Sequence, residues 1–390
     1  MKVCHVITRM IVGGAQENTL FSAQGLVESG HECTLMTGPS PGPEGELLAR
    51  TGAPDGIKVE TCPYLVREIS PVNDLKAYFF LRNYFREHDF DVVHTHSSKA
   101  GIIGRLAARA AGVPVVVHTI HGLPFHPREK WWKNRLYAAL EAYAAKHCDR
   151  IFAVAQAMVD QALARNIGTP DMYQVVYSGM NLTHFLTAER DPGLRAALGI
   201  PEHAKVLGTV ARLFPLKGYE ELMKIAPDLL RAEKDLYFLF VGDGELHEKL
   251  KKQAEDGGFA DRIVFAGLVA PSEVGKYIAQ MDVLAHFSLR EGLPRAAVQA
   301  LACGKPVVAY PLDGTPEVVM DGKTGILCPP DDTAAMTEAI GRLLADGALR
   351  ERMGSAGREL VRGKFAWRNM SDTLIAAYEK LLNDKALRRV

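Results

Sequence analysis

A carboxylate in the second half of the chain sits where sugar and phosphate chemistry needs one. Glu291 lies in the turn Glu291-Gly292-Leu293-Pro294, and the predicted helix that follows carries Gln299, eight residues further on. A helix start presents backbone N–H groups without intrahelical partners and the positive end of the helix dipole. The segment therefore offers a phosphate site flanked by polar side chains. An ordinary loop–helix–strand unit of an α/β domain explains the same spacing equally well.

Two cations follow an earlier predicted strand. Arg212 and Lys217 occupy the loop between that strand and the next helix, five residues apart. Paired cations in a strand–helix loop suit a diphosphate. Two unrelated surface cations are the alternative, but the position at the carboxyl end of the strand argues against it.

Glycines occupy other loops of the same kind. Gly13 and Gly14 follow the first predicted strand, whereas Gly242 and Gly267 each follow a strand in the second half. Adjacent glycines let a backbone approach a ligand closely. The first loop does not read Gly-x-Gly-x-x-Gly, so it is a weak signal for a dinucleotide, and on its own a tight turn is the better interpretation.

A histidine marks the equivalent position in the first half. His121 lies after a predicted strand and before Gly122, where it can donate a hydrogen bond to a sugar or act as an acid or base. A histidine that merely caps a strand is the alternative. Four further histidines lie nearby and raise the question of a metal: His94, His96, His118 and His126. Their spacing matches no usual zinc pattern, so we predict no metal site.

A basic segment with paired tryptophans opens another predicted helix. Residues 128–135 read REKWWKNR, and the helix continues to about residue 146. Basic residues with interfacial aromatics are typical of segments that lie on an anionic membrane surface. We favour the alternative, a surface helix on which Trp131 and Trp132 pack inward.

The order of elements predicts two α/β domains. Strands and helices alternate from residue 3 to 177, and a second set begins at residue 205. Residues 178–198 are expected to be a linker with a break at Pro192-Gly193. The Gly- and Pro-rich stretch 39–54 is expected to be a loop, and three helices are expected to end the chain.

Composition restricts the function classes. The 390 residues suffice for two domains, and 46 basic residues balance 46 acidic ones, which argues against a general nucleic-acid binder. The six cysteines are scattered without a Cys-x-x-Cys pair, as in a reduced, cytoplasmic protein. We expect no leader peptide, and no apolar run approaches the ~20 residues of a membrane span.

Six motifs in order resemble the large retaining glycosyltransferase family 4. They are Gly13-Gly14, His121-Gly122, residues 210–213 with Lys217-Gly218, Gly242-Asp243-Gly244, residues 291–294 and residues 314–317. Each motif alone is weak, whereas the ordered set spans nearly the whole chain. The resemblance implies the GT-B fold, in which two Rossmann-like, doubly wound domains face a cleft. It implies an acceptor-side domain at 1–182, a nucleotide-sugar domain at 183–365, and a helix at 366–390 that packs back on the first domain.

The resemblance also implies residue roles. Arg212 and Lys217 would hold the donor's diphosphate and stabilise the leaving group, while Glu291 would contact hydroxyl groups of the donor sugar. The backbone of Gly292, Leu293 and Pro294 would assist the phosphate. Gln299 would bind the ribose, and His121 would hydrogen-bond the donor sugar near the reacting carbon. Four glycines would let backbone approach the nucleotide: Gly13, Gly14, Gly242 and Gly267.

The implied reaction is hexosyl transfer from a nucleotide diphosphate sugar, a UDP-sugar, to a glycan or lipid-linked acceptor in polysaccharide or glycolipid assembly. No metal or other cofactor is expected, because the two cations replace a metal, and the anomeric configuration is retained. We expect a cytoplasmic enzyme and leave open a peripheral contact with the inner membrane face. Gln299 departs from the family pattern, where many relatives have Glu, and weaker nucleotide binding is one possible effect.

Two alternatives stay open at this point. A sugar-nucleotide epimerase shares the fold, but it needs a pair of carboxylates at the sugar, and apart from Glu291 and Glu317 the sequence offers no convincing pair. A non-catalytic nucleotide-sugar-binding protein is supported only by Gln299.

Overall fold

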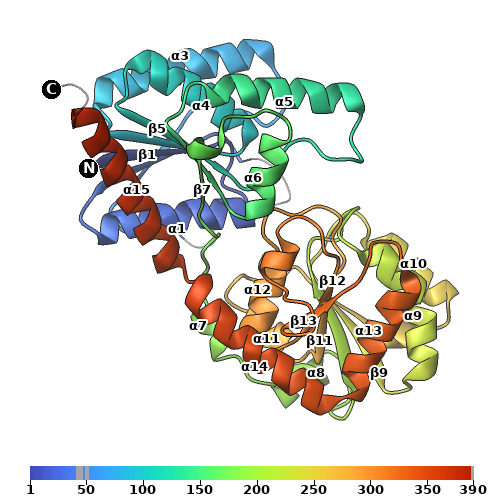
Figure 1. Ribbon diagram of the computed structural model, residues 1–390. Helices are drawn as coiled ribbons and strands as arrows, with labels where there is room; N and C mark the ends of the chain where they lie inside the picture. The colour runs from blue at the N-terminus through green and yellow to red at the C-terminus, as the bar shows by residue number, and fades with distance from the viewer. Residues whose placement is uncertain (41–46, 49–51, 388–390) are drawn as a thin grey trace. The chain divides into compact units, whose positions relative to one another are not determined.

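The computed structural model describes residues 1–40, 47–48 and 52–387, so most of the expected loop at 39–54 lies outside the described residues. The chain divides into two compact units. Unit 1 comprises Met1–Met180 with Phe365–Val390, and unit 2 comprises Asn181–Lys364. The last helix thus belongs to unit 1, to which the chain returns after completing unit 2 (Figure 1).

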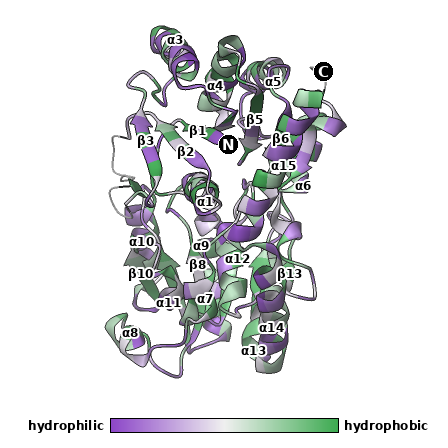
Figure 2. Cartoon of the chain, turned by 90° about the vertical axis from the view of Figure 1, so that its left-hand side faces the viewer, coloured by the Kyte–Doolittle hydropathy of each residue, from purple (hydrophilic) through white to green (hydrophobic). Residues whose placement is uncertain are grey.

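Unit 1 contains a sheet of seven parallel strands in the order β3-β2-β1-β4-β5-β6-β7. The strands are β1 (Lys2–Ile7), β2 (Glu32–Thr37), β3 (Ile57–Thr61), β4 (Val92–His96), β5 (Val115–Ile120), β6 (Arg150–Ala153) and β7 (Tyr173–Val175). The central strands are buried along almost their whole length, as expected of a parallel sheet covered on both faces. The edge strand β3 instead mixes hydrophilic and hydrophobic residues (Figure 2).

Helices cover both faces of this sheet. The helices are α1 (Gly14–Glu28), α3 (Pro71–His88), α4 (Ser98–Ala111), α5 (Trp131–Ala145), α6 (Gln156–Leu163), the short 3-10 helix η1 (Pro170–Met172) and α15 (Trp367–Leu387). Helices α3, α4 and α5 lie together on one face, and α1 packs against α15 on the other (Figure 1). Helix α4 ends at Gly112, whose φ of 82° is a left-handed cap that favours glycine.

Unit 2 contains a sheet of six parallel strands in the order β10-β9-β8-β11-β12-β13. The strands are β8 (Lys205–Val210), β9 (Leu236–Val241), β10 (Ile263–Gly267), β11 (Val283–His286), β12 (Val307–Ala309) and β13 (Gly325–Leu327). Its helices are α7 (Thr183–Leu186), α8 (Pro192–Ala197), α9 (Tyr219–Ala232), α10 (His247–Asp256), α11 (Val274–Ala279), α12 (Arg295–Ala302), α13 (Thr333–Ala345) and α14 (Gly347–Lys364), with 3-10 helices η2 (Ala260–Arg262) and η3 (Thr315–Glu317).

Both sheets reverse their strand order at one place. In unit 1 the reversal falls between β1 and β4, and in unit 2 between β8 and β11. In open α/β sheets, ligands bind beyond the carboxyl ends of the strands at such a switch point. The fold therefore singles out the loops that follow these four strands.

Two sequence predictions need correction. Pro192-Gly193 is not a break, because Pro192 starts α8, where its missing N–H costs nothing, and the Asp191 carboxylate accepts a hydrogen bond from the Gly193 N–H at 2.8 Å. The inward packing of the paired tryptophans is also wrong. Trp131 is 71% exposed and Trp132 is 49% exposed.

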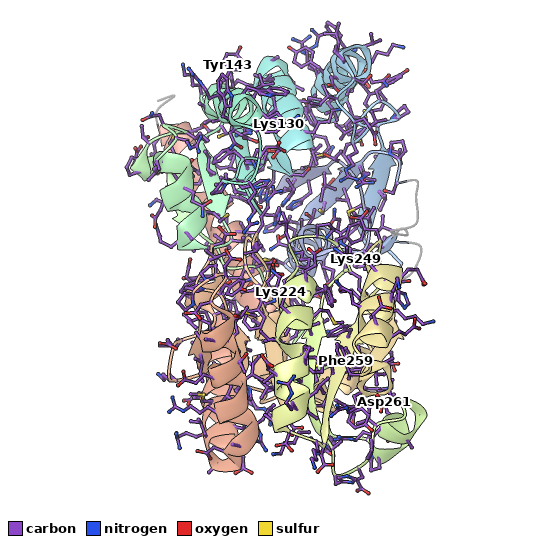
Figure 3. The ribbon with its side chains drawn as sticks, turned by 90° about the vertical axis from the view of Figure 1, so that its right-hand side faces the viewer. Lys130, Tyr143, Lys224, Lys249, Phe259 and Asp261 are labelled. Carbon is purple, nitrogen blue, oxygen red and sulfur yellow. The ribbon has the colours of Figure 1, made fainter. Side chains whose placement is uncertain are left out.

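The tryptophans are exposed because a different face of α5 packs against the neighbouring helix. Helix α5 contacts α4, and its buried positions are small or polar: Asn134, Ala138, Glu141, Ala144 and Ala145. The large apolar side chains Leu136, Leu140 and Tyr143 remain exposed with the tryptophans. Figure 3 labels Lys130, which precedes the helix, and Tyr143, near its end, on the surface of unit 1. Among the described helices, none combines the length and apolar character needed to cross a membrane.

Candidate functional site

The switch point of unit 2 brings together the two charged residues that the sequence singled out. Lys217 lies in the loop after β8, and Glu291 lies in the loop after the neighbouring strand β11. The Lys217 Nζ is 2.7 Å from the Glu291 Oε1, and their side chains are 27% and 16% exposed. The two loops thus form a partly buried ion pair at the edge of the sheet where ligands bind.

Backbone geometry holds the Lys217 loop against β11. Gly218 has a φ of 87°, and a Cβ added there would lie 2.7 Å from the Phe287 backbone, so both conformation and space require glycine. The Leu216 carbonyl accepts a hydrogen bond from the Leu289 N–H at 2.9 Å and another from the Ser288 hydroxyl at 3.2 Å. Lys217 is therefore positioned by main-chain contacts as well as by its charge.

The Glu291 carboxylate lies among cationic and polar groups. Burial raises the pKa of the Glu291 carboxyl, but Lys217, His286 and hydrogen bonds outweigh burial, so the pKa is lowered overall. The Glu291 N–H donates to the Asp313 carboxylate at 2.7 Å, which ties the turn to the loop before η3. Glu291 is thus an ionised hydrogen-bond acceptor at neutral pH, suited to hydroxyl groups.

His286 is the residue at this site that sequence reasoning missed. It ends β11, its Nε2 is 3.6 Å from the Glu291 Oε1, and its side chain is 7% exposed. Burial lowers the pKa of the His286 imidazole, Glu291 raises it, and Lys217 lowers it, with a net decrease. Its buried Nε2 has no hydrogen-bond partner among the described residues. The one signal for it in the sequence is a lone polar residue at the end of an apolar strand.

The other predicted residues of unit 2 surround the same edge. Arg212 places its guanidinium over the Phe214 ring, 5.0 Å from the centroid. The Gly242 N–H donates to the Gly267 carbonyl at 2.9 Å, and the φ of Gly242 is 138°. A Cβ at Gly242 would lie 2.0 Å from the Ala211 carbonyl oxygen. The loops after β8 and β9 and the end of β10 are thus in direct contact.

The turn after Glu291 leads directly into α12. Pro294 is the N-cap of α12, and the Gly292 carbonyl accepts from the Gly314 N–H at 3.2 Å. Leu293 is buried. Gln299 lies inside α12 and is partly exposed.

A separate hollow lies on the same unit. It has a volume of about 360 Å³ and is lined by the end of α12 and one side of α14: Cys303, Gly304, Glu351, Ser355, Arg358, Glu359 and Arg362. Cys303 caps the end of α12, whereas Glu291 precedes its start, so this hollow is distinct from the ion pair. None of the predicted site residues is among those that line it.

Unit 1 carries the remaining predicted residues. Gly13 is the N-cap of α1, Gly14 is its first residue, and the loop follows β1 at the switch point of this sheet. His121 follows β5 and is partly exposed. The His121 Nε2 lies 2.9 Å from the His96 Nδ1, and the His96 Nε2 lies 2.8 Å from the His5 Nδ1. His5 was not singled out from the sequence, because one histidine within an apolar strand resembles any core residue.

The two halves of the chain match two family models. Residues 13–179 match a "Glycosyl transferase 4-like domain", and residues 191–360 match "Glycosyl transferases group 1". A UDP-Gal:alpha-D-GlcNAc-diphosphoundecaprenol alpha-1,3-galactosyltransferase of Escherichia coli is 29% identical over 367 residues, 93% of each chain. A D-inositol 3-phosphate glycosyltransferase of Catenulispora acidiphila is 32% identical over 308 residues, 75% of this chain and 73% of the relative.

Solved structures show the same architecture. Anabaena HepE in complex with UDP and glucose superposes with a TM-score of 0.82 at 21% identity, over 97% of this chain and all of the other. Sucrose-phosphate synthase of Thermosynechococcus elongatus gives a TM-score of 0.81 at 20% identity, over 98% of this chain and all of the other. The two doubly wound units thus have the GT-B fold, and the chain belongs to the group 1 glycosyl transferases, the glycosyltransferases of the family 4 type.

Proposed function

We propose that this glycosyltransferase moves a hexose from a UDP-sugar to a lipid-linked glycan, with retained anomeric configuration and without a bound metal. The observation that carries the proposal is the Lys217–Glu291 ion pair at the switch point of unit 2. A cation for phosphate and a carboxylate for hydroxyl groups lie side by side there, as a sugar diphosphate requires.

The charges explain how the site would handle the donor. A diphosphate brings negative charge to Lys217 and Arg212, and it competes with Glu291 for the lysine. Lys217 then stabilises the leaving group, and Glu291 becomes available for the hydroxyl groups of the sugar. The two cations would do the work that a metal performs at other diphosphate sites.

The state of Glu291 defines its part in the proposed reaction. Its lowered pKa keeps the carboxyl ionised at neutral pH, so it accepts hydrogen bonds and does not act as a proton donor. In the proposed front-face reaction, a phosphate oxygen of the donor takes the proton of the acceptor hydroxyl. The new bond forms on the side that the leaving group vacates, which retains the configuration. Gln299 would hold the ribose by its amide.

The relatives guide the choice of donor and acceptor. The Escherichia coli relative is named for UDP-galactose and a diphosphoundecaprenol-linked acceptor, and it covers nearly the whole chain. HepE was solved with UDP. We therefore propose a UDP-sugar and a polyprenyl-diphosphate-linked acceptor.

Helix α5 supports an acceptor at a lipid surface. Its exposed tryptophans are accompanied by four basic residues at the start of the helix: Arg128, Lys130, Lys133 and Arg135. The Lys133 Nζ lies 5.8 Å from the centroid of the Trp132 ring. Exposed aromatics with a basic border fit the interface of an anionic membrane. We propose that this face of unit 1 rests on the membrane.

The function is tested by binding and transfer. UDP should raise the unfolding temperature more than GDP or ADP, since a ligand stabilises the folded state by mass action. Undecaprenyl-diphosphate-N-acetylglucosamine with UDP-galactose should give a disaccharide whose α linkage NMR can identify, with chelator present. Lys217→Ala and Glu291→Gln should abolish transfer, whereas Lys224→Ala, an exposed lysine on α9, should not. Full transfer by both variants would overturn the proposal.

The membrane contact is tested by vesicle flotation. The wild type should float with vesicles that contain phosphatidylglycerol and less with phosphatidylcholine alone. Trp131→Ala with Trp132→Ala should weaken flotation. Lys130→Glu with Lys133→Glu tests the basic border. Its control is Lys249→Glu with Lys252→Glu, which changes the charge equally at two exposed residues of α10. Equal flotation by all variants would contradict the proposal.

A further inference from the structure

Three histidines form a continuous row in unit 1. The His5 Nδ1 is 2.8 Å from the His96 Nε2, and the His96 Nδ1 is 2.9 Å from the His121 Nε2. His5 and His96 are fully buried, and His121 is partly exposed. The row therefore leads from the core of the sheet to a residue at its edge.

The fold explains why the three rings meet. Strands β1 and β4 are parallel neighbours at the switch point, and His5 is paired in register with His94. His96 lies two residues beyond His94, so the side chains of His5, His94 and His96 are on one face of the sheet. His96 is paired with Thr119 on β5, and His121 lies two residues beyond Thr119, directly after the end of that strand. The row thus crosses three adjacent strands at their carboxyl ends.

Hydrogen-bond counting couples the tautomers of the three rings. Burial lowers the pKa of His5 to about 3 and that of His96 well below its ordinary value, so both rings are neutral. A neutral imidazole donates from one nitrogen and accepts at the other. His96 has a ring partner at each nitrogen, so it must accept from one ring and donate to the other. The tautomer of His121 therefore follows that of His96, and the tautomer of His96 follows that of His5.

The two directions of the row are not equivalent. Reversal moves the hydrogen between the nitrogens of every ring. It also exchanges a bare nitrogen for an N–H at the His5 Nε2, which is buried without a partner in the part of the chain that the structure describes. Since a buried donor and a buried acceptor differ in cost, one direction dominates.

A bound metal is the competing explanation. One ring nitrogen from each of His5, His94 and His96 lies within 4.8 Å of the other two. The two nitrogens of His94, however, lie 2.5 Å from the Tyr378 hydroxyl and 2.6 Å from the Thr119 hydroxyl. Those of His96 are both taken by other rings. A metal would have to break these bonds, so the hydrogen-bonded row accounts for the cluster better.

We infer that His96, oriented by His5, is a positioning residue that holds the His121 ring in one tautomer and one orientation. His121 then presents a defined donor or acceptor at the edge of the sheet. The benefit to transfer rests on the proposed function and on the role that the family resemblance implies for His121, a hydrogen bond to the donor sugar. The tautomer itself does not rest on it.

The experiment reads the tautomer directly. Ring-¹⁵N histidine is incorporated, and the His121 signals are assigned by their loss in His121→Asn. In the wild type, one His121 nitrogen should have the shift of a protonated nitrogen and the other that of a bare one. In His96→Phe the two shifts should approach a common average. His118→Asn changes a buried histidine of β5 that is bonded to Thr95 on the other face of the sheet, and it should leave the His121 signals unchanged.

Kinetics supply the second readout. His96→Phe should lower kcat for transfer at least about tenfold, a part of the roughly 10²–10⁴-fold that a positioned acid–base group contributes, and should change KM for the donor far less. A wild-type spectrum with averaged His121 shifts would overturn the inference without any variant. His121 shifts that His96→Phe leaves unchanged would also overturn it. A changed spectrum with unchanged kcat would support the positioning and contradict the sugar contact of His121.

Discussion

Replacing Lys217 with Met tests the energetics of the ion pair in unit 2. The change removes the cation and keeps an unbranched side chain, which leaves the Glu291 carboxylate partly buried beside His286 and Ser288. Breaking a fully buried pair costs about 3–5 kcal/mol. Exposure of 27% and 16% places this pair below that range, at about 2 kcal/mol of unfolding free energy at pH 7.

The pH dependence has a definite sign. In the wild type the pKa of Glu291 is lowered, so the pair contributes stability above the ordinary carboxyl pKa, and this contribution is lost as pH falls through the lowered value. Without Lys217, burial raises the pKa of Glu291. Protonation then removes the unpaired charge, so the deficit of the variant is largest near pH 7 and shrinks towards pH 4.

The assay must report on unit 2. All three tryptophans, Trp131, Trp132 and Trp367, belong to unit 1, so their fluorescence does not follow unit 2 directly. Calorimetry measures the unfolding of both units, and a loss of about 2 kcal/mol should lower the midpoint of unit 2 by roughly 4–8 °C. Glu291→Gln combined with Lys217→Met should recover part of the loss, because no unpaired charge remains. A deficit that is equal at pH 7 and pH 4, or losses that simply add, would refute the reasoning.

Three further outcomes follow from the packing and from Gln299. Gly218→Ala should destabilise unit 2 by about 1–3 kcal/mol and weaken UDP binding, because φ is positive and Phe287 blocks the Cβ; calorimetric titration that finds unchanged UDP affinity would contradict this. Gly25→Ala should destabilise unit 1 by about 1–3 kcal/mol, since its Cβ would lie 2.3 Å from that of Ser371 on α15, and Ser371→Gly should restore the loss in thermal unfolding followed by tryptophan fluorescence. Gln299→Glu should lower KM for the donor, because a carboxylate accepts from ribose hydroxyls more strongly than an amide does; a raised KM in steady-state kinetics would place Gln299 away from the ribose.

The sequence was sufficient to predict the two doubly wound sheets. Apolar strands that alternate with helices leave few other architectures, and the GT-B fold is confirmed by the solved structures. The sequence could not show which face of α5 is buried. Trp131 was expected to pack inward because it is large and apolar, but α4 accepts only small and polar partners from α5, and this depends on the tertiary packing.

The site was predictable in its parts but not in its contacts. Glu291 and Lys217 were each recognised by their loops, yet they lie 74 residues apart, and their pairing depends on β8 being next to β11 in the sheet. His286 and His5 were missed for a related reason. Each is a histidine in a mostly apolar strand, and its contacts become known only when the neighbouring strand is known.

The return of the chain to unit 1 has a consequence for synthesis on the ribosome. Met180 and the segment that leads into α15 are joined by two backbone hydrogen bonds, of 2.9 Å to the Phe365 carbonyl and 3.1 Å from the Trp367 N–H. At about 5–20 residues per second, the ribosome needs roughly 10–40 s to make unit 2 before α15 emerges. During that interval the sheet face that carries His94 and Phe152 lacks Tyr378, which packs against both. The nascent chain thus carries an open apolar face at the stage when chaperones can bind it.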